Sequence, residues 1–179
     1  MEDRFIMAGF GGQGVMLMGE LMASAAMSME NEVTFMPSYG PEMRGGTANC
    51  SVIISNAPIA SPIVMDPTVL VAMNEPSFAK FEKTVCPGGS IFYNKSLFDP
   101  DKSRDDIEYI PVDCTQAARE IRSEKVSNIV MLGAVVRRTG ILPEKAVSDA
   151  IARKFMGSKA GYIPVNKKAL AALKERPVS

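Results

Sequence analysis

The sequence predicts a single α/β domain with a mainly parallel sheet flanked by helices and a helical C-terminal portion. Short buried apolar runs alternate with helical patterns over residues 1–125, and residues 126–179 read as helices. At 179 residues with 46% hydrophobic residues, the chain has the length of one ordinary domain and can bury a core. We therefore treat 1–179 as one domain.

The first elements are a strand, a glycine turn and a helix. Residues 4–8 form a short apolar run that stops at Gly9, and residues 15–29 are strong helix formers with Glu20 as their only charge. A helix that is apolar on nearly every side must be covered on every side. Either it lies in the middle of a three-layer core, or another subunit covers its outer face.

Further strands and helices follow in alternation. The three prolines within 57–67 predict an extended connection. The charged segment 99–106 is expected to be a solvated loop. Apolar runs and capping signals predict strands at 33–36, 47–55, 69–73, 90–93 and 107–112 and helices at 115–124, 128–139 and 166–176, with two more that begin at 74–77 and at Pro143. Gly140 is the expected stop of helix 128–139.

Composition excludes several classes of function. Twenty basic residues balance twenty acidic ones, so the chain lacks the field of a nucleic-acid or anionic-membrane binder. There is no histidine, which argues against a self-contained hydrolase triad. Cys50, Cys86 and Cys114 are far apart without a Cys-x-x-Cys pair, so no metal or cluster site is expected and each is expected to be buried. Neither a signal peptide nor a membrane span is expected, which indicates a cytoplasmic chain.

Two glycine-dense loops follow the first two strands. Parallel strands end at one edge of a sheet, where open α/β folds bind ligands, so both loops are expected to line one crevice. The first loop has glycine at positions 9, 11, 12 and 14 with Gln13 between them, and it opens a helix whose free amides attract an anion. The crevice therefore favours a phosphate-bearing ligand.

The spacing of Gly9, Gly11 and Gly14 matches the dinucleotide pattern, but the match alone is weak. A dinucleotide site also needs an acid at the carboxyl end of the second strand. Glu30 and Glu32 precede that strand and are expected at the opposite edge, which argues against NAD.

The second loop supplies one cation. Arg44 lies beside Gly45 and Gly46, and its planar fork suits phosphate or carboxylate. The alternative is that Arg44 pairs with Glu42 and only orders the loop. Tyr39 could hydrogen-bond or stack on a ligand, or simply pack.

Three segments resemble the gamma subunit of the 2-oxoacid:ferredoxin oxidoreductases. They are residues 9–15, residues 38–50 and the run Ala72, Met73 and Asn74, and the similarity spans nearly the whole chain, including residues 131–134. The match over 39–50 looks closest to the 2-oxoglutarate branch, then to the branched-chain 2-oxoisovalerate branch.

The resemblance implies a complex that decarboxylates a 2-oxoacid on thiamine diphosphate, passes electrons through iron-sulfur clusters to ferredoxin and transfers the acyl group to coenzyme A. It implies alpha and beta partner subunits and a ferredoxin-like delta subunit, which carry the thiamine diphosphate and the clusters. No catalytic residue is assigned to this chain. The expected coenzyme A contacts are Gly9, Gly11, Gly12, Gln13, Gly14, Tyr39, Arg44, Gly45, Gly46 and Asn74.

Two alternatives remain open. The chain could be a free-standing nucleotide- or flavin-binding module, which would copurify with a coloured or fluorescent ligand. It could also be an assembly scaffold whose glycines only satisfy turn geometry.

Overall fold

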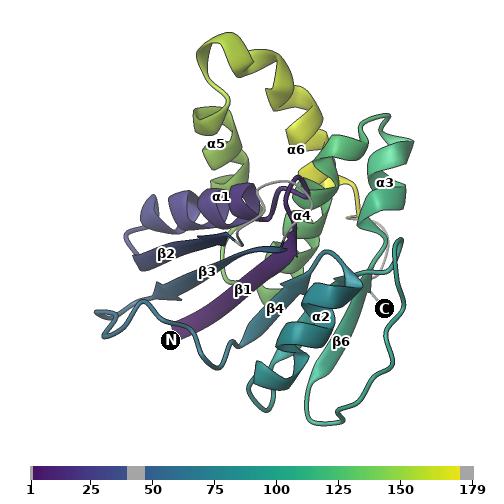
Figure 1. Cartoon of the computed structure of the whole chain (residues 1–179). Coiled ribbons are helices and arrows are strands. Elements are labelled where there is room, and N and C mark those ends of the chain that lie inside the picture. Colours follow the sequence, from purple (N-terminus) through teal and green to yellow (C-terminus); the bar gives the residue numbers. More distant parts are fainter. Residues whose placement is uncertain (1, 40–46, 174–179) are drawn as a thin grey trace.

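The computed structural model describes residues 2–39 and 47–173, which form one six-stranded sheet with helices on both faces (Figure 1). The strands are β1 (Glu2–Phe10), β2 (Glu32–Tyr39), β3 (Thr47–Ser55), β4 (Val69–Ala72), β5 (Ser90–Asn94) and β6 (Glu108–Val112). The α-helices are α1 (Val15–Met27), α2 (Glu75–Phe81), α3 (Cys114–Glu120), α4 (Ser127–Thr139), α5 (Glu144–Lys154) and α6 (Ile163–Ala171). Three short 3₁₀ helices are η1 (Glu82–Thr84), η2 (Glu124–Val126) and η3 (Gly157–Tyr162).

The sheet has the order β2-β3-β1-β4-β5-β6. Strands β1, β4, β5 and β6 pair in parallel, whereas β3 is antiparallel to both of its neighbours, β1 and β2. Because β3 reverses direction between them, β1 and β2 run the same way. This arrangement confirms the predicted mainly parallel α/β class.

The register brings the ends of β1 and β2 to the same edge of the sheet. Ala48 of β3 lies opposite Tyr39 on one side and opposite Gly9 on the other. Tyr39, Ala48 and Gly9 therefore form one row, and both glycine-dense segments leave the sheet at that edge. At the other edge, Ser55 lies opposite Glu32 and Glu2, which places Glu32 away from the glycine turn as expected.

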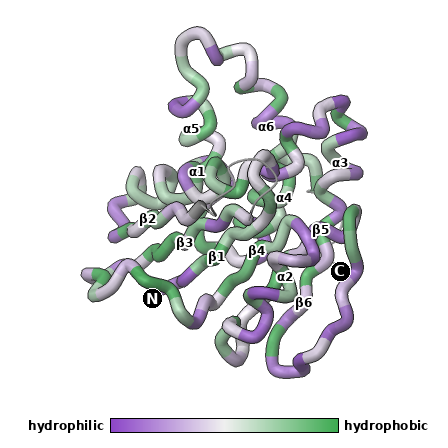
Figure 2. The backbone as a smooth tube through the Cα atoms, in the orientation of Figure 1, coloured by the Kyte–Doolittle hydropathy of each residue, from purple (hydrophilic) through white to green (hydrophobic). Residues whose placement is uncertain are grey.

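Two hydrophobic clusters lie on the two faces of the sheet. The larger joins side chains of β1, β3 and β4 to α1, α4, α5 and α6, and the smaller joins the opposite face of β1, β4 and β5 to α2. In Figure 2 the hydrophobic colouring follows the central strands β1 and β4. The helical C-terminal portion thus packs on the α1 face of the sheet and completes its core.

Helix α1 is covered mainly by its own chain, which confirms the first of the two readings for most of its surface. Its buried residues are Val15, Met18, Gly19, Leu21, Met22, Ala23, Ala25 and Ala26. The sheet covers one side, and α4 and α5 pack against the other. Met27, the last residue of α1, remains 66% exposed. The helix ends two residues before the predicted position because the chain turns there, with Glu30 in the left-handed region at φ 62°.

Helix α4 is the buried helix of the C-terminal portion. It has nine consecutive buried residues, from Asn128 to Val136, and Gly140 ends it in the left-handed conformation at φ 65°, as predicted. Arg137 Nη1 donates to the carbonyl oxygen of Leu170 at 2.7 Å and to Glu144 Oε2 at 3.1 Å, which joins α4 to both α5 and α6.

Several predicted boundaries shift. Helix α3 ends at Glu120 rather than near 124, because Arg122 adopts φ 59°. Helix α6 begins at Ile163, three residues earlier than predicted, and ends at Ala171, before the predicted end at 176, where the amide of Ala172 bonds to the carbonyl oxygen of Ala169 in a tighter turn. The 57–67 segment contains neither helix nor strand, as expected, and no described helix is long and apolar enough to cross a membrane.

The charged segment 99–106 contains neither helix nor strand and most of its residues are exposed, as predicted, but it is also anchored to the rest of the chain. Glu82 is 7% exposed and accepts hydrogen bonds from Ser103 at 2.9 Å and from the Tyr109 hydroxyl at 2.5 Å. Arg104 pairs with Asp106 at 2.6 Å and donates to the carbonyl oxygen of Val85. Glu82 and Val85 lie 21 and 19 residues before Ser103 and Arg104, which is why the local charge pattern did not reveal these contacts.

Cys50 and Cys114 are fully buried as expected, whereas Cys86 is half-buried. Burial raises the pKa of both the Cys50 and Cys114 thiols to about 12. Because a raised pKa keeps the thiol protonated, neither should form a reactive thiolate between pH 7 and pH 9.

We expect maleimide at pH 8 to label native protein only at Cys86 and to label all three cysteines after denaturation. Rapid native labelling of Cys50 or Cys114, followed by mass spectrometry, would contradict this packing.

Candidate functional site

The turn from β1 to α1 is built almost entirely of backbone. Gly12 and Gly14 have φ angles of 102° and 73°, in the region that favours glycine. Among the residues that the structure describes, none lies within 4 Å of an ideal Cβ placed on Gly12, so no described side chain blocks the approach to Gly12. A ligand can therefore approach the turn backbone closely at this point.

The hollow at this turn has a volume of about 300 Å³. It is lined by Phe10, Gly11, Gly12, Gly14, Val15, Met16, Leu17 and Ala48. Gly14 is the N-cap of α1, and the helix has neither a side-chain cap nor an acidic residue in its first turn. The first amides of a helix have no partner within the helix and carry a partial positive charge, and the first residues of α1, Val15, Met16 and Leu17, line this hollow.

Gln13 joins the turn to the neighbouring turn between β4 and α2. Its Oε1 accepts hydrogen bonds from the amide of Phe10 at 2.7 Å and from Asn74 Nδ2 at 2.9 Å, and its Nε2 donates to the carbonyl oxygen of Met73 at 3.2 Å. Asn74 in turn caps α2, because its Oδ1 accepts from the amide of Ser77 at 2.9 Å. The structure thus brings together Gln13 and Asn74, two residues that the sequence analysis assigned to the ligand. The polar groups of both side chains form hydrogen bonds with other groups of the protein.

Gln13 is therefore expected to set the shape of the turn. Gln13→Ala removes the partners of Asn74 Nδ2, the Phe10 amide and the Met73 carbonyl, and we expect a loss of about 1–3 kcal/mol of unfolding free energy. Urea denaturation measures it. Gln116→Ala on the exposed side of α3 is the control and should stay within about 0.5 kcal/mol of the wild type. Equal stability of the two variants would contradict the role given to Gln13.

Asn128 is a site residue that the sequence analysis missed. This buried residue in the first turn of α4 donates from Nδ2 to the carbonyl oxygen of Gly14 at 3.1 Å. A Cβ on Gly14 would lie 2.3 Å from the same nitrogen, so Gly14 is needed both for its φ angle and for this contact. The available signal in the sequence was an asparagine at the start of an otherwise apolar helix, but its partner, Gly14, lies 114 residues away.

The second glycine-dense segment lies outside the described residues. Arg44, Gly45 and Gly46 fall within 40–46, as does Glu42, the alternative partner of Arg44. The segment is bounded by Tyr39 and Thr47, and Thr47 lies directly opposite Phe10 at the beginning of the first turn. The two glycine-dense segments therefore begin at the same edge of the sheet.

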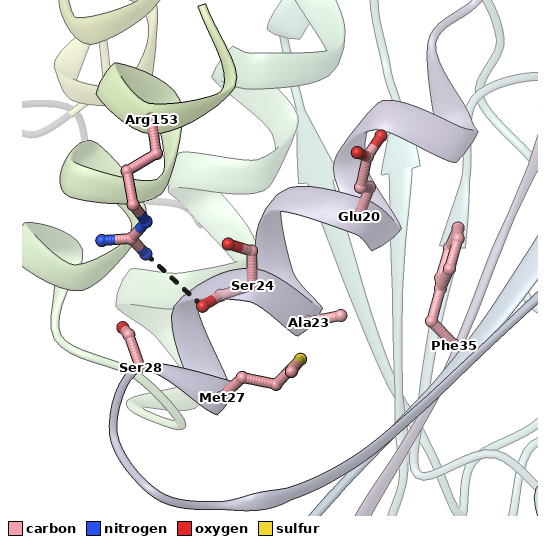
Figure 3. Close-up of a pocket in the computed structure, with 7 residues that line it drawn as sticks. All are labelled: Glu20, Ala23, Ser24, Met27, Ser28, Phe35 and Arg153. Carbon is pink, nitrogen blue, oxygen red and sulfur yellow. Dashed lines mark hydrogen bonds between the residues drawn. The ribbon is translucent and has the colours of Figure 1, made fainter. Parts of the chain in front are cut away.

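A larger cavity lies along the C-terminal half of α1 (Figure 3). Its volume is about 510 Å³, and it is lined by Glu20, Ala23, Ser24, Met27, Ser28, Phe35 and Arg153. Its one arginine, Arg153, donates to the carbonyl oxygen of Ser24 at a long 3.5 Å. This cavity lies at the C-terminal half of α1, away from the free amides at the beginning of that helix, so the glycine turn is the better candidate for an anionic ligand.

No group of three or more histidine, cysteine, aspartate or glutamate residues that could hold a metal ion occurs within 2–39 and 47–173.

The sequence pattern of the pyruvate ferredoxin/flavodoxin oxidoreductase family matches residues 4–174. The chain belongs to this family. The match covers nearly the full length and confirms the family resemblance seen in the sequence.

Relatives in this oxidoreductase family come from both branches that the sequence indicated. The ketoisovalerate oxidoreductase subunit VorA of Methanothermobacter marburgensis is 41% identical over 173 residues, which cover 96% of this chain and 36% of VorA. The chain thus spans about a third of the length of VorA. The 2-oxoglutarate synthase subunit KorC of Methanocaldococcus jannaschii is 36% identical over 154 residues, covering 84% of this chain and 82% of KorC. Over these alignments the identity is higher with the ketoisovalerate relative, and the ranking of the branches from residues 39–50 stays a prediction.

Solved structures from the oxidoreductase family share the fold. The gamma subunit of a keto/oxoacid ferredoxin oxidoreductase from Geobacter sulfurreducens is 26% identical with a TM-score of 0.83, and the match covers 96% of this chain and 94% of that one. A 2-oxoglutarate:ferredoxin oxidoreductase from Magnetococcus marinus, with 2-oxoglutarate, coenzyme A and succinyl-CoA bound, has a TM-score of 0.85 at 23% identity. That match covers 99% of this chain and 32% of the other, so the fold there forms part of a longer chain.

Proposed function

We propose that this chain is the gamma subunit of a 2-oxoacid:ferredoxin oxidoreductase complex and helps to bind coenzyme A beside the thiamine diphosphate of a partner subunit. The complex converts a 2-oxoacid and coenzyme A into acyl-CoA and carbon dioxide, and two electrons pass to ferredoxin. The observation that carries this proposal is the open, side-chain-poor turn at Gly12 beside the uncapped N-terminus of α1, in a chain of this family.

The chemistry of coenzyme A fits this turn. Its diphosphate is a compact dianion, and helix-terminal amides bind such groups when no side chain blocks the approach. The direct contacts are assigned to the turn backbone at Gly11, Gly12 and Gly14, with Arg44 supplying a charge-assisted pair. Gly9, Gln13 and Asn74 are assigned to holding the turn in shape, because a Cβ on Gly9 would lie 2.7 Å from Gln13 Oε1.

Catalysis is assigned to partner subunits. The proposed partners are the alpha and beta subunits and a ferredoxin-like delta subunit, which hold the thiamine diphosphate and the iron-sulfur clusters. The sequence supports this division because it contains no histidine and its three cysteines lack cluster spacing. Affinity capture of this chain from its native source should bring thiamine-dependent and cluster-bearing chains with it, and the isolated chain should not oxidise 2-oxoacids.

The alternative of a free-standing dinucleotide module is less well supported. Such a module holds the ribose with an acid at the carboxyl end of its second strand, but Glu32 begins β2 at the opposite edge. A purified chain that retains a nucleotide or flavin would favour this alternative.

Arg44 provides the first test of the coenzyme A assignment. In the assembled complex, Arg44→Ala should raise the KM for coenzyme A by about tenfold or more, because a charge-assisted hydrogen bond to a phosphate is lost. Steady-state titration with coenzyme A measures the effect. An unchanged KM would contradict the assignment.

Glu42→Ala is the matched variant, because Glu42 is the alternative partner of Arg44. If Arg44 contacts coenzyme A, removing Glu42 should leave the KM for coenzyme A near the wild-type value. If both variants raise the KM equally, Arg44 acts only by ordering its own loop.

A further inference from the structure

The chain arches from α5 through η3 to α6 (Figure 1). A second hollow is lined by residues of this arch together with residues of α1, η2 and α4. Its volume is about 270 Å³, and it is lined by Leu17, Lys125, Val126, Asn128, Phe155, Lys159, Tyr162 and Asn166. Leu17 also lines the hollow at the glycine turn, and Asn128 donates a hydrogen bond to Gly14. The two hollows are therefore neighbours, and one extended ligand can reach both.

The walls of the second hollow are apolar and partly aromatic. Leu17 and Val126 contribute aliphatic side chains to the lining, and the rings of Phe155 and Tyr162 lie with their centroids 6.3 Å apart. Tyr162 is 60% exposed, so its ring is available to a guest. Asn166 fixes this wall, because its Nδ2 donates to the carbonyl oxygen of Tyr162 at 2.7 Å. Such a site favours a flat, unsaturated group.

Two lysines add positive charge to this hollow. Lys125 comes from η2 and Lys159 from η3, and both side chains are exposed. Within the parts of the chain that the structure describes, neither lysine has an ion-pair partner, whereas Lys145 pairs with Asp149 and Lys154 with Glu20. Two unpaired ammonium groups beside an aromatic wall favour a guest with both a ring and a phosphate.

We propose that this hollow binds the 3′-phosphoadenosine head of coenzyme A, with adenine against the Phe155 and Tyr162 wall and the 3′-phosphate between Lys125 and Lys159. A phosphate monoester carries a charge of about −1.5 to −2 at pH 7, which two lysines balance. The diphosphate then lies at the glycine turn. This assignment rests on the proposed function, since it places one more part of the same substrate.

The test compares coenzyme A with 3′-dephospho-coenzyme A in the assembled complex. The wild type should have a KM at least about tenfold lower for coenzyme A, because charged hydrogen bonds to the 3′-phosphate are made only with that substrate. The double variant Lys125→Ala/Lys159→Ala should raise the KM for coenzyme A by about the same factor and leave that for the dephospho form unchanged. The ratio of the two KM values should then approach one.

Two further variants make the result specific. Lys125→Arg/Lys159→Arg should restore most of the discrimination, because the charge is retained. Lys145→Ala, which removes an exposed lysine that does not line the hollow, should keep the wild-type ratio. General damage to the subunit would raise both KM values together, so it would leave the ratio unchanged.

A wild-type complex that does not discriminate between the two substrates would overturn the assignment. So would an alanine variant that keeps the wild-type ratio. After either of these outcomes, the effect of Gly12→Val decides what is wrong. If Gly12→Val still raises the KM for coenzyme A, only the adenosine site is wrong and the proposed function stands. If Gly12→Val is also without effect, the role of this chain in binding coenzyme A is wrong as well.

Discussion

Gly133→Ala should lower the unfolding free energy by about 2–4 kcal/mol, although it replaces glycine by the best helix former. A Cβ on Gly133 would lie 2.1 Å from the carbonyl oxygen of Leu170 and 3.0 Å from its carbonyl carbon. Both atoms are backbone, so α6 must move away from α4 to make room. The expected gain in helix propensity, about 1 kcal/mol, is smaller than the cost of this displacement.

The displacement also breaks a polar contact. Arg137 donates to the same Leu170 carbonyl at 2.7 Å, and this bond holds α6 against α4. For a chain of this length, the loss corresponds to a Tm lower by about 5–12 °C. Thermal unfolding followed by circular dichroism measures the change.

Gly161→Ala is the matched control for this substitution. Gly161 lies in η3, and within 2–39 and 47–173 no residue lies within 4 Å of a Cβ placed there. This variant should melt within about 1–2 °C of the wild type. If Gly133→Ala melts with the control, the close packing of α4 on α6 is not as the structure describes.

The sequence predicted the elements of the fold well but not their arrangement. Periodicity and glycine signals identified β1, α1 and the end of α4 at Gly140, because local backbone preferences determine them. The position of β3 between β1 and β2 was not predicted, since strand order depends on pairing between distant segments. The anchoring of the 99–106 segment by Glu82 and Tyr109 was missed for the same reason.

The candidate site could also be predicted only in part from the sequence. Glycine spacing predicted a turn open to a ligand, because positive φ angles and the absence of side chains are properties of single residues. The sequence did not show that Gln13 and Asn74 bind each other, and both were assigned to the ligand. The contact of Asn128 with Gly14 was also hidden, because it joins residues 114 positions apart.

Gly12→Val should cause the largest loss of coenzyme A affinity among substitutions at the described turn. The new side chain would project into the space where the diphosphate is proposed to lie, because no residue that the structure describes lies within 4 Å of its Cβ. We expect the KM for coenzyme A to rise at least about tenfold, which corresponds to about 1.4 kcal/mol of lost binding. The KM for the 2-oxoacid should stay within about twofold of the wild type.

Gly88→Val separates lost binding from backbone strain. Gly88 also has a positive φ angle, 78°, and open space around its Cβ, but it precedes β5 at the opposite edge of the sheet. Gly12→Val and Gly88→Val should therefore lower the unfolding free energy by a similar amount, about 1–2 kcal/mol, because each forces a side chain into a backbone conformation with positive φ. Only the variant at the glycine turn should lose affinity for coenzyme A.

The most direct measurement is a coenzyme A titration of complexes that carry wild-type chain, Gly12→Val or Gly88→Val, after gel filtration has shown that all three contain every subunit. A selective rise in the KM for coenzyme A with Gly12→Val is the predicted result. Wild-type kinetics with Gly12→Val would contradict it, and would mean that the glycines of this turn serve the geometry of a scaffold.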